Sequence, residues 1–543
     1  MLTPKHHSGP ARRAAGLRRI PARLRAALLL LALGLIAYAS WRLLAQRTRA
    51  WAVAEVPVAF WTWHSSTPAQ ADVQRAIDGA GARTLFIRAG QIDYYQNAVR
   101  RIRAVTGRFP VGVEIHLVYN ATPDLLSQIE RLDSASFASE IARSYEADAE
   151  RAMRDGARVA GVQLDIDVPT RLLPKYEQFL GAIRERLPKG AILSITGLAT
   201  WMNSPEVARV VAASDFWVLQ CYGATVPERL DRVTPISSPQ QVARAVDRAR
   251  AVGRPFYAGL AAYGYAIRYA RNGKFIEMSG SLDPSLVAQS PDLELVERKP
   301  FASTPVSDGG AIASEDRLVY RAREDAAIGE LGLRAGEWLV LDLPTAESLR
   351  ASARAVRERA GDRLLGICVF RLPAEDDPTT LTIQEVQSAL ADVPPTVAAT
   401  VNMKMIARDD ARADDDRRVL TVTIQNAGSA SALMGGDAII VDLRVPAGSV
   451  RRVSLDGFAS SKMLYERPGG KAAVDGEALQ PCGPGRANLV RLAAPAWRPG
   501  DGPTAFLELA TELPQSISIL ITVRTDAGRV WRDERIVKVS AVP

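Results

Sequence analysis

The chain of 543 residues lacks a cysteine framework. Its three cysteines, Cys221, Cys368 and Cys482, lie far apart. An odd and dispersed set gives neither a disulfide plan nor the ligand spacing of a metal site. Cys221 and Cys368 sit in apolar runs, which predicts two small buried side chains. No glycine-rich phosphate loop follows the first apolar run, which argues against a nucleotide-binding open sheet.

Acidic residues are absent from the first 54 positions, which hold ten Lys or Arg. The whole chain carries 68 basic and 60 acidic residues, a net charge of +8. The rest of the chain, from residue 55 onward, has 58 basic and 60 acidic residues, a net charge of −2. The basic character therefore belongs to the N-terminus, and the remainder has no bulk charge that favours nucleic acid as a partner.

The N-terminal segment predicts a membrane anchor. A basic tail (1–25) precedes an uncharged run, and the span can extend over 26–45 because Arg42 can snorkel. The positive flank should stay cytoplasmic, which makes the chain a single-pass protein of a bacterial inner membrane with its body periplasmic or extracellular. A cleaved signal peptide is the alternative, because Ala37-Tyr38-Ala39 forms an A-x-A site. Under both interpretations, the body of the protein is exported from the cytoplasm.

Residues 55–392 alternate short apolar runs with amphipathic helical stretches. Near-continuous apolar strands with helical crossovers predict a parallel sheet covered on both faces. Eight runs match a TIM-like (β/α)8 barrel, with a doubly wound open sheet as the alternative. An irregular stretch at about 265–345 is expected to be an insertion at the barrel mouth. The eight runs lie at 56–63, 84–89, 111–119, 159–167, 191–199, 215–223, 255–264 and 364–373.

The chain changes character after Pro394-Pro395. Residues 396–543 show alternating apolar and polar runs separated by Gly, Pro and Asp turns. This pattern is typical of an antiparallel β-sandwich. We therefore expect an immunoglobulin-like accessory domain after the α/β barrel.

The stretch GVQLDIDVP (161–169) places two acids at the end of a core strand. An ionised carboxylate in an apolar interior costs several kcal/mol unless it is paired or solvated. Side chains alternate along a strand, so Gln163, Asp165 and Asp167 share one face, and the branched residues between them share the other. In a barrel the polar face would point inward and toward the C-terminal mouth, where the active sites of such barrels lie.

Polar and aromatic residues end the other runs in the same way. If the runs form one barrel, these side chains converge on one pocket and would bind a substrate there. Each also has a structural interpretation: the acids could cap a turn or form salt bridges, and a lone histidine in an apolar run is more often a core residue. The candidates for substrate binding are His64, Arg88, His116, Gln163, Trp201, Gln220, Tyr263 and Arg371.

Several stretches resemble family 18 glycoside hydrolases, the chitinases. VAGVQLDIDVP, YEQFLGAIRERLP and ILSITGLATW resemble the fourth-strand region of that family, which reads D-G-x-D-x-D-x-E. WVLQCYG, GLAAYGYA and LLGICVFRLPAEDD resemble its sixth to eighth strands. The whole set is similar to a bacterial family of unknown function whose members are predicted to be glycoside-hydrolase-like barrels.

The resemblance implies roles for three residues, Asp165, Asp167 and Tyr222. Asp167 takes the position of the catalytic Glu and would be the general acid, with a raised pKa. Asp165 would orient an N-acetyl group that acts as internal nucleophile, and Tyr222 would bind its oxygen. Without an N-acetyl sugar, Asp165 itself would have to be the nucleophile. Trp201 or Phe370 would stack on the sugar.

The sequence also departs from the chitinase pattern. Ala160 and Gln163 stand at the first two Asp positions, and Gly223 replaces the Asp that follows the tyrosine. Asp167 is one methylene shorter than the expected Glu. Misplacement on that scale can reduce a rate about a hundredfold.

Three hypotheses remain open from the sequence. The first is a membrane-anchored, exported glycoside hydrolase acting on an envelope or extracellular polysaccharide. The second is a carbohydrate-binding barrel without chemistry. The third, a metal-dependent polysaccharide deacetylase, would use His64, His116 and the two aspartates, although their spacing is no known ligand signature. No organic cofactor or bound metal is expected under the first two.

Overall fold

The computed structural model describes residues 52, 55–223, 227–232, 235–305, 311–407, 418–432, 437–467, 479–525 and 530–541. The predicted tail and anchor (1–25 and 26–45) lie outside these residues. None of the helices within the described residues is both long enough and apolar enough to span a bilayer.

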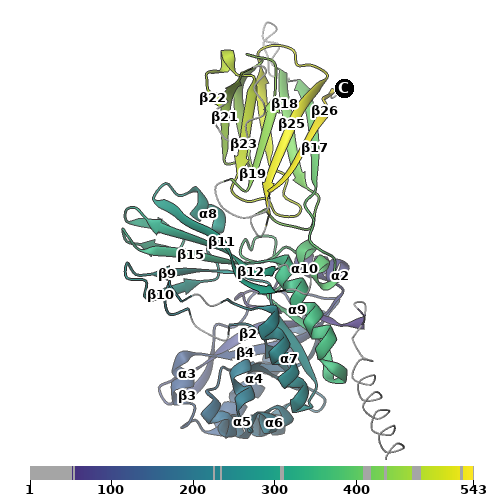
Figure 1. The fold of residues 1–543 in the computed structure, drawn as a ribbon. Helices are drawn as coiled ribbons and strands as arrows, with labels where there is room; N and C mark the ends of the chain where they lie inside the picture. Colours follow the sequence, from purple (N-terminus) through teal and green to yellow (C-terminus); the bar gives the residue numbers. More distant parts are fainter. Residues whose placement is uncertain are drawn as a thin grey trace, which may run out of the picture. The chain divides into compact units, whose positions relative to one another are not determined.

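Eight parallel strands close into a TIM-like barrel (Figure 1). Each strand pairs in parallel with its neighbours, and β1 pairs with both β2 and β16, which closes the sheet on itself. The predicted barrel is therefore confirmed, and the open sheet is excluded. The strands are β1 (Val58–Thr62), β2 (Ala82–Tyr95), β4 (Glu114–Ala121), β5 (Arg158–Asp165), β6 (Ile192–Leu198), β7 (Phe216–Gln220), β8 (Phe256–Ala261) and β16 (Leu364–Phe370).

Alternation along the strands divides the barrel into two cores. Val162, Leu164 and Ile166 pack outward with the helices, as their spacing predicts. Phe86 and Val218 pack inside the barrel. The helices around the strands are α2 (Gln70–Ala80), α3 (Pro123–Gln128), α4 (Ser134–Arg154), α5 (Leu173–Arg186), α6 (Val207–Ala212), α7 (Pro239–Val252), α9 (Ala346–Arg359) and α10 (Ile383–Leu390).

A second sheet lies in the chain between β8 and α9. Its five strands are antiparallel in the order β10-β9-β15-β12-β11. The apolar run EWLVLDLP forms β15 of this sheet, not a barrel strand. One face of the sheet packs with Tyr222 and Tyr263. The elements are β9 (Tyr265–Tyr269), β10 (Phe275–Ser279), α8 (Pro284–Gln289), β11 (Leu293–Pro305), β12 (Ala311–Ala322), β13 (Ala326–Ile328), β14 (Leu331–Leu333) and β15 (Trp338–Pro344).

One hairpin was not expected from the sequence. Strand β2 continues past the barrel and pairs with the antiparallel strand β3 (Ala98–Ile102). Gln96 and Asn97 form the turn with positive φ angles of 52° and 59°. Two central residues of this kind are typical of a type I′ turn, whose twist matches that of the flanking strands.

The C-terminal part is all β. Two sheets with the orders β20-β24-β18-β17-β27 and β22-β21-β23-β19-β25-β26 share one apolar core, which includes Leu420, Val441 and Trp497. The strands are β17 (Ala399–Ala407), β18 (Arg418–Asn426), β19 (Ile439–Arg444), β20 (Val450–Asp456), β21 (Ser460–Glu466), β22 (Leu479–Pro481), β23 (Leu489–Ala494), β24 (Thr504–Leu509), β25 (Ser516–Arg524), β26 (Val530–Lys538) and β27 (Ser540–Ala541).

A glycine on β5 permits close approach of β6. A Cβ atom added at Gly161 would lie 2.1 Å from the carbonyl oxygen of Ile192, whereas one at Gly181 on α5 would meet nothing within 4 Å. We expect Gly161→Ala to lower the free energy of unfolding by about 1–3 kcal/mol, because the two strands must separate. Gly181→Ala is the matched control and should raise it by about 0.5–1 kcal/mol, because alanine favours a helix. Urea denaturation measures both, and equal effects would contradict this account of β5.

Candidate active site at the barrel mouth

Asp165 lies at the C-terminal end of β5, within a ring of polar side chains. Thr196 Oγ1 donates a hydrogen bond of 2.8 Å to Asp165 Oδ1, and Gln220 Nε2 donates one of 3.4 Å to the same oxygen. Asn120 on β4 pairs with Asp165 in the sheet register. Four neighbouring strands, β4 to β7, thus contribute one polar residue each at the same level of the barrel.

Both acids of this site have raised pKa values. Burial raises the pKa of Asp165 to about 7, and the charge of Asp167 adds to the rise. The hydrogen bond from Thr196 and the charge of Arg88 work in the opposite direction. Partial desolvation by the surrounding protein atoms also raises the pKa of Asp167, although solvent still reaches its side chain. Near pH 7 the pair can therefore present a protonated acid and a carboxylate together.

The acids remain accessible from the mouth. Asp165, Gln220 and Tyr222 are half-buried, and Asp167 is exposed. Trp201 stabilises the turn that carries Asp167, because its indole Nε1 donates a 2.8 Å hydrogen bond to the carbonyl of Val168. Trp201 itself is fully buried in the core between strands and helices. The expectation that Trp201 stacks on a sugar is therefore wrong, since its indole follows the turn outward into the helical layer.

Aromatic rings form the opposite side of the mouth. The ring of Phe370 stacks on Tyr222, with centroids 5.4 Å apart, and lies edge-on to Tyr263 at 4.9 Å. Trp61 and Trp63 contact the same Phe370 ring at 5.1 and 6.1 Å. Burial raises the pKa of Tyr222 well above its usual range, and the charges of Tyr263, Asp165 and Asp167 act in the same direction. Tyr222 therefore keeps its proton and can donate a hydrogen bond from the aromatic side of the mouth.

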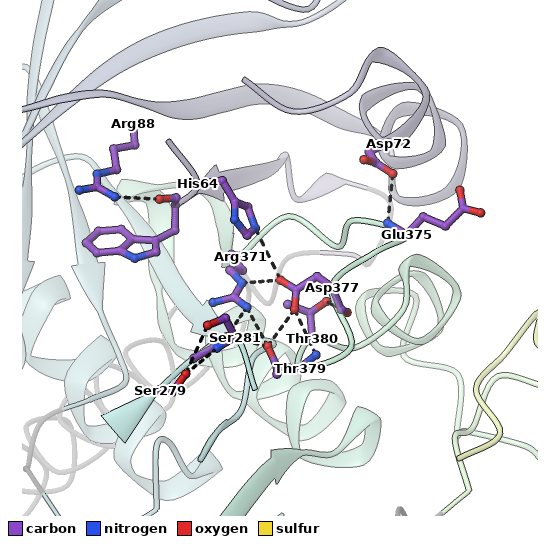
Figure 2. Close-up of polar contacts among 12 residues, drawn as sticks. His64, Asp72, Arg88, Ser279, Ser281, Arg371, Glu375, Asp377, Thr379 and Thr380 are labelled. Carbon is purple, nitrogen blue, oxygen red and sulfur yellow. Dashed lines mark hydrogen bonds and ion pairs between the residues drawn. The ribbon is translucent and has the colours of Figure 1, made fainter. Parts of the chain in front are cut away.

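Arg88 enters the mouth from β2. Its Nη1 donates to the carbonyl oxygen of Trp63 at 3.1 Å, and its guanidinium lies over the Trp63 ring, 4.5 Å from the centroid (Figure 2). Its Nε donates to Asn120 Oδ1 at 3.2 Å. These contacts align β1, β2 and β4 at the level of Asp165. Asn120 was missed as a site residue, although it directly follows the third apolar run.

His64 and Arg371 both contact a buried carboxylate, Asp377 (Figure 2). Arg371 Nε donates to Asp377 Oδ2 at 2.6 Å, and His64 Nε2 lies 3.7 Å from the same oxygen. Although burial works to raise it, the pKa of Asp377 is held well below its usual range by hydrogen bonds from His64, Arg371 and Thr379. Arg371 Nη2 also donates to the carbonyl of Gly280, between β10 and α8, at 2.7 Å.

These contacts change the interpretation of Arg371. The side chain is largely buried and connects the loop after β16 to the inserted sheet, so its observed contacts are structural, although it also borders the cleft beside His64. The sequence places its partner Asp377 in a loop after β16, where strand periodicity gives no signal. His64 is different, because about half of its side chain is exposed.

A cleft of about 700 Å³ opens beside this network. Trp63 and His64 line it from the end of β1, Asp72 and Arg75 from α2, and Glu375 from the loop after β16. Asp72 accepts a hydrogen bond from the backbone N–H of Glu375 at 3.3 Å (Figure 2). His64 therefore faces a polar cleft with one aromatic wall. It does not contact Asp165 or Asp167.

Two predicted residues lie on the inward face but below the mouth. Gln163 is fully buried, and its Nε2 lies 3.4 Å from Ser194 Oγ. His116 is buried against Phe86, with ring centroids 5.1 Å apart, and its Nε2 lies 3.6 Å from Glu114 Oε1. Both side chains are therefore buried beneath the mouth and are not exposed in it. The prediction that these two side chains face the barrel interior is confirmed. Their expected position at the mouth is wrong, because both lie further back along their strands.

The residues of the metal hypothesis are not gathered in one place. His116 contacts Glu114, and His64 contacts Asp377, while Asp165 bonds Thr196 and Gln220. Across the described ranges, no group of three or more His, Cys, Asp or Glu side chains could hold a metal ion. The geometry thus offers the deacetylase alternative no donor set in this part of the chain.

The raised pKa of Asp165 predicts a pH-dependent cost to stability. The folded state keeps the proton up to about pH 7, whereas an unfolded Asp loses it near 3.9, so stability falls as the pH rises between these values. We expect Asp165→Asn to raise the free energy of unfolding by about 1–3 kcal/mol at pH 8 and by much less at pH 4.5. Urea denaturation at the two pH values measures this.

The matched control for this experiment is Asp362→Asn, which changes an exposed carboxylate on a short turn after α9. In this variant, the difference between the free energies of unfolding at pH 4.5 and pH 8 should be the same as in the parent. If Asp165→Asn raised the free energy of unfolding equally at pH 4.5 and pH 8, the assignment of Asp165 as a desolvated acid would be contradicted.

Residues 121–296 match the model of a domain of unknown function, DUF3142. The expected resemblance to a family of unknown function is thus confirmed for this segment, which includes Asp165, Asp167 and Tyr222. No curated protein matches the chain.

Solved structures with similar folds include three enzymes. A chitinase from Chromobacterium violaceum is 16% identical, covers 62% of this chain and 99% of its own, and has a TM-score of 0.39. The spore cortex-lytic enzyme SleL of Bacillus cereus is 14% identical, and the match covers 62% of this chain and 74% of SleL with a TM-score of 0.39. A chitinase from Bacteroides thetaiotaomicron is 12% identical, with 62% and 97% covered and a TM-score of 0.36.

Proposed function

We propose that the barrel mouth is the active site of a glycoside hydrolase. The observation that carries the proposal is the pair Asp165 and Asp167, two neighbouring acids with raised pKa values at the C-terminal end of a barrel strand. Hydrolysis of a glycosidic bond uses two carboxyl groups, one of which must hold a proton near neutral pH. Aromatic side chains opposite the acids suit the apolar faces of sugar rings.

The two acids would share one proton near neutral pH, and Asp167, the more exposed of the two, is better placed to deliver it as general acid. It would protonate the glycosidic oxygen of the leaving sugar. Asp165, held by Thr196 and Gln220, would remain next to it as the stabilising or attacking carboxylate. Tyr222 would donate a hydrogen bond to the substrate from the aromatic side. If the substrate carries an N-acetyl group, this arrangement supports its use as internal nucleophile.

Replacement of the general acid tests this proposal. We expect Asp167→Asn to reduce the release of reducing ends at least a hundredfold, because general acid catalysis contributes at least that factor. Chitooligosaccharides and polysaccharides of isolated bacterial envelopes serve as substrates. The control, Asp78→Asn on the outer surface of α2, should keep the parent rate. Turnover that survives Asp167→Asn contradicts the assignment.

A carbohydrate-binding barrel is the second candidate. It is favoured by one observation, the Asp at the position where the chitinase pattern has the longer Glu. Affinity electrophoresis in gels that contain the same polysaccharides separates the two candidates. Retardation by a glycan that the parent never hydrolyses supports binding without chemistry.

We further propose that the chain is exported and held in the membrane by residues 26–45. The basic tail and the span, which is uncharged over 26–41, support this location, and the immunoglobulin-like accessory part would then face the envelope with the barrel. Alkaline phosphatase fused after residue 543 should be active, because that enzyme needs an oxidising compartment. Replacing Leu30, Leu31 and Leu33 by Asp should abolish that activity and the membrane fraction together. An inactive fusion to the unaltered chain contradicts the proposed orientation.

A further inference from the structure

Arg88 is a half-buried cation at the barrel mouth whose partners are all neutral. It donates to the side-chain oxygen of Asn120 and to the backbone oxygen of Trp63, and its guanidinium lies over the Trp63 ring. Within the described residues no carboxylate oxygen lies within 4.0 Å of it. A guanidinium has five N–H donors, and these contacts use only two of them.

Several partly buried arginines of the barrel and its insertion are paired with acids, whereas Arg151 and Arg254 donate to backbone oxygens away from the mouth. Arg371 contacts Asp377 at 2.6 Å, Arg268 contacts Glu337 at 2.8 Å, and Arg350 contacts Asp392 at 3.1 Å. Removing a cation from water costs free energy, which a well-placed acid offsets in part. Arg88 bears this cost without an ion pair, at the level of the barrel where a substrate would lie.

A second cation acts on Arg88. Burial lowers the pKa of Arg88, and the charge of Arg103, an exposed residue after β3, lowers it further, while Asp165 has the opposite effect. An anion bound at this side of the mouth would relieve the repulsion between the two guanidinium groups. The planar fork of an arginine matches the two oxygens of a carboxylate.

We propose that Arg88 binds the carboxylate of an acidic sugar residue, such as a uronic acid, in the glycan that occupies the mouth. This proposal rests on the proposed glycan-directed function and names its substrate class. Asn120 connects the two halves of the site, because it bonds Arg88 and pairs in register with Asp165. The carboxylate-bearing sugar would therefore lie next to the acids, on the β2 side of the mouth.

A competing role for Arg88 is purely electrostatic. Its charge lowers the pKa of Asp165, and that effect alone could account for a cation at this position. The two roles predict different results. An electrostatic partner alters catalysis on every substrate equally, whereas a carboxylate receptor distinguishes acidic from neutral glycans.

Binding of matched glycans tests the proposal. The probes are oligosaccharides of hyaluronan, alginate and polygalacturonate, the same oligosaccharides with methyl-esterified carboxyl groups, and chitohexaose. Calorimetry with the full chain at 0.15 M salt screens nonspecific attraction at the surface. For at least one pair, we expect the acid to bind about tenfold more tightly than its ester, the factor that one charge-assisted contact provides.

The variants identify the residue responsible. Arg88→Gln should reduce the acid-to-ester ratio to about one while affinity for the ester is kept. Arg83→Gln changes an exposed arginine at the other end of β2 and should keep the tenfold ratio. Equal binding of acid and ester by the parent, or an equal loss of both in Arg88→Gln, overturns the proposal. If chitohexaose or the esters bind without any preference for acids, only this inference fails; if no glycan binds in any form, the proposed function fails with it.

Discussion

The organisation of this protein depends on how the barrel accommodates ionisable acids at the end of a core strand. Strand β5 is buried from Gly161 to Leu164, yet it ends in Asp165. Alternation turns that carboxyl inward, and closure of the sheet places the ends of β4, β6 and β7 beside it. Thr196 and Gln220 then supply hydrogen bonds, but the surroundings still disfavour the charged form, so that the pKa of Asp165 rises to about 7. Stability is reduced at the position where a proton can be used for chemistry.

The two sides of the mouth serve different purposes. On the β1 and β16 side, Trp61, Trp63 and Phe370 form a continuous aromatic wall, which Tyr222 and Tyr263 extend. On the β2 and β4 side, Arg88 and Asn120 offer hydrogen-bond donors and a positive charge. The acids lie between them. A ligand with apolar ring faces, many hydroxyl groups and a carboxylate fits all three surfaces, which is why the glycan proposal and its acidic sugar belong together.

Sequence periodicity predicted which face of each strand points inward, but not how deep each side chain lies. Gln163 and His116 share the inward face with Asp165 and Asn120, yet both are buried below the mouth. Loop residues gave no periodic signal. Asp377 was not anticipated, although it converts Arg371 from an expected ligand contact into a buried ion pair. Trp201 follows β6 by only a few residues, where a short 3-10 turn directs its indole into the helical layer. The run that became β15 was apolar enough for a barrel strand, and only its antiparallel pairing assigns it to the inserted sheet.

The protonation of Asp165 is the property on which the proposed chemistry depends most directly. It can be measured by following the side-chain carboxyl carbon of Asp165 in a ¹³C-labelled protein by NMR across pH 3 to 9, with Asp165→Asn to assign the signal. A titration midpoint near 7 is expected from its burial beside Asp167. A midpoint near the ordinary value of about 3.9 would contradict the proposed active site, because the burial and the charge of Asp167 that should hold a proton on this pair near neutral pH would then be without effect.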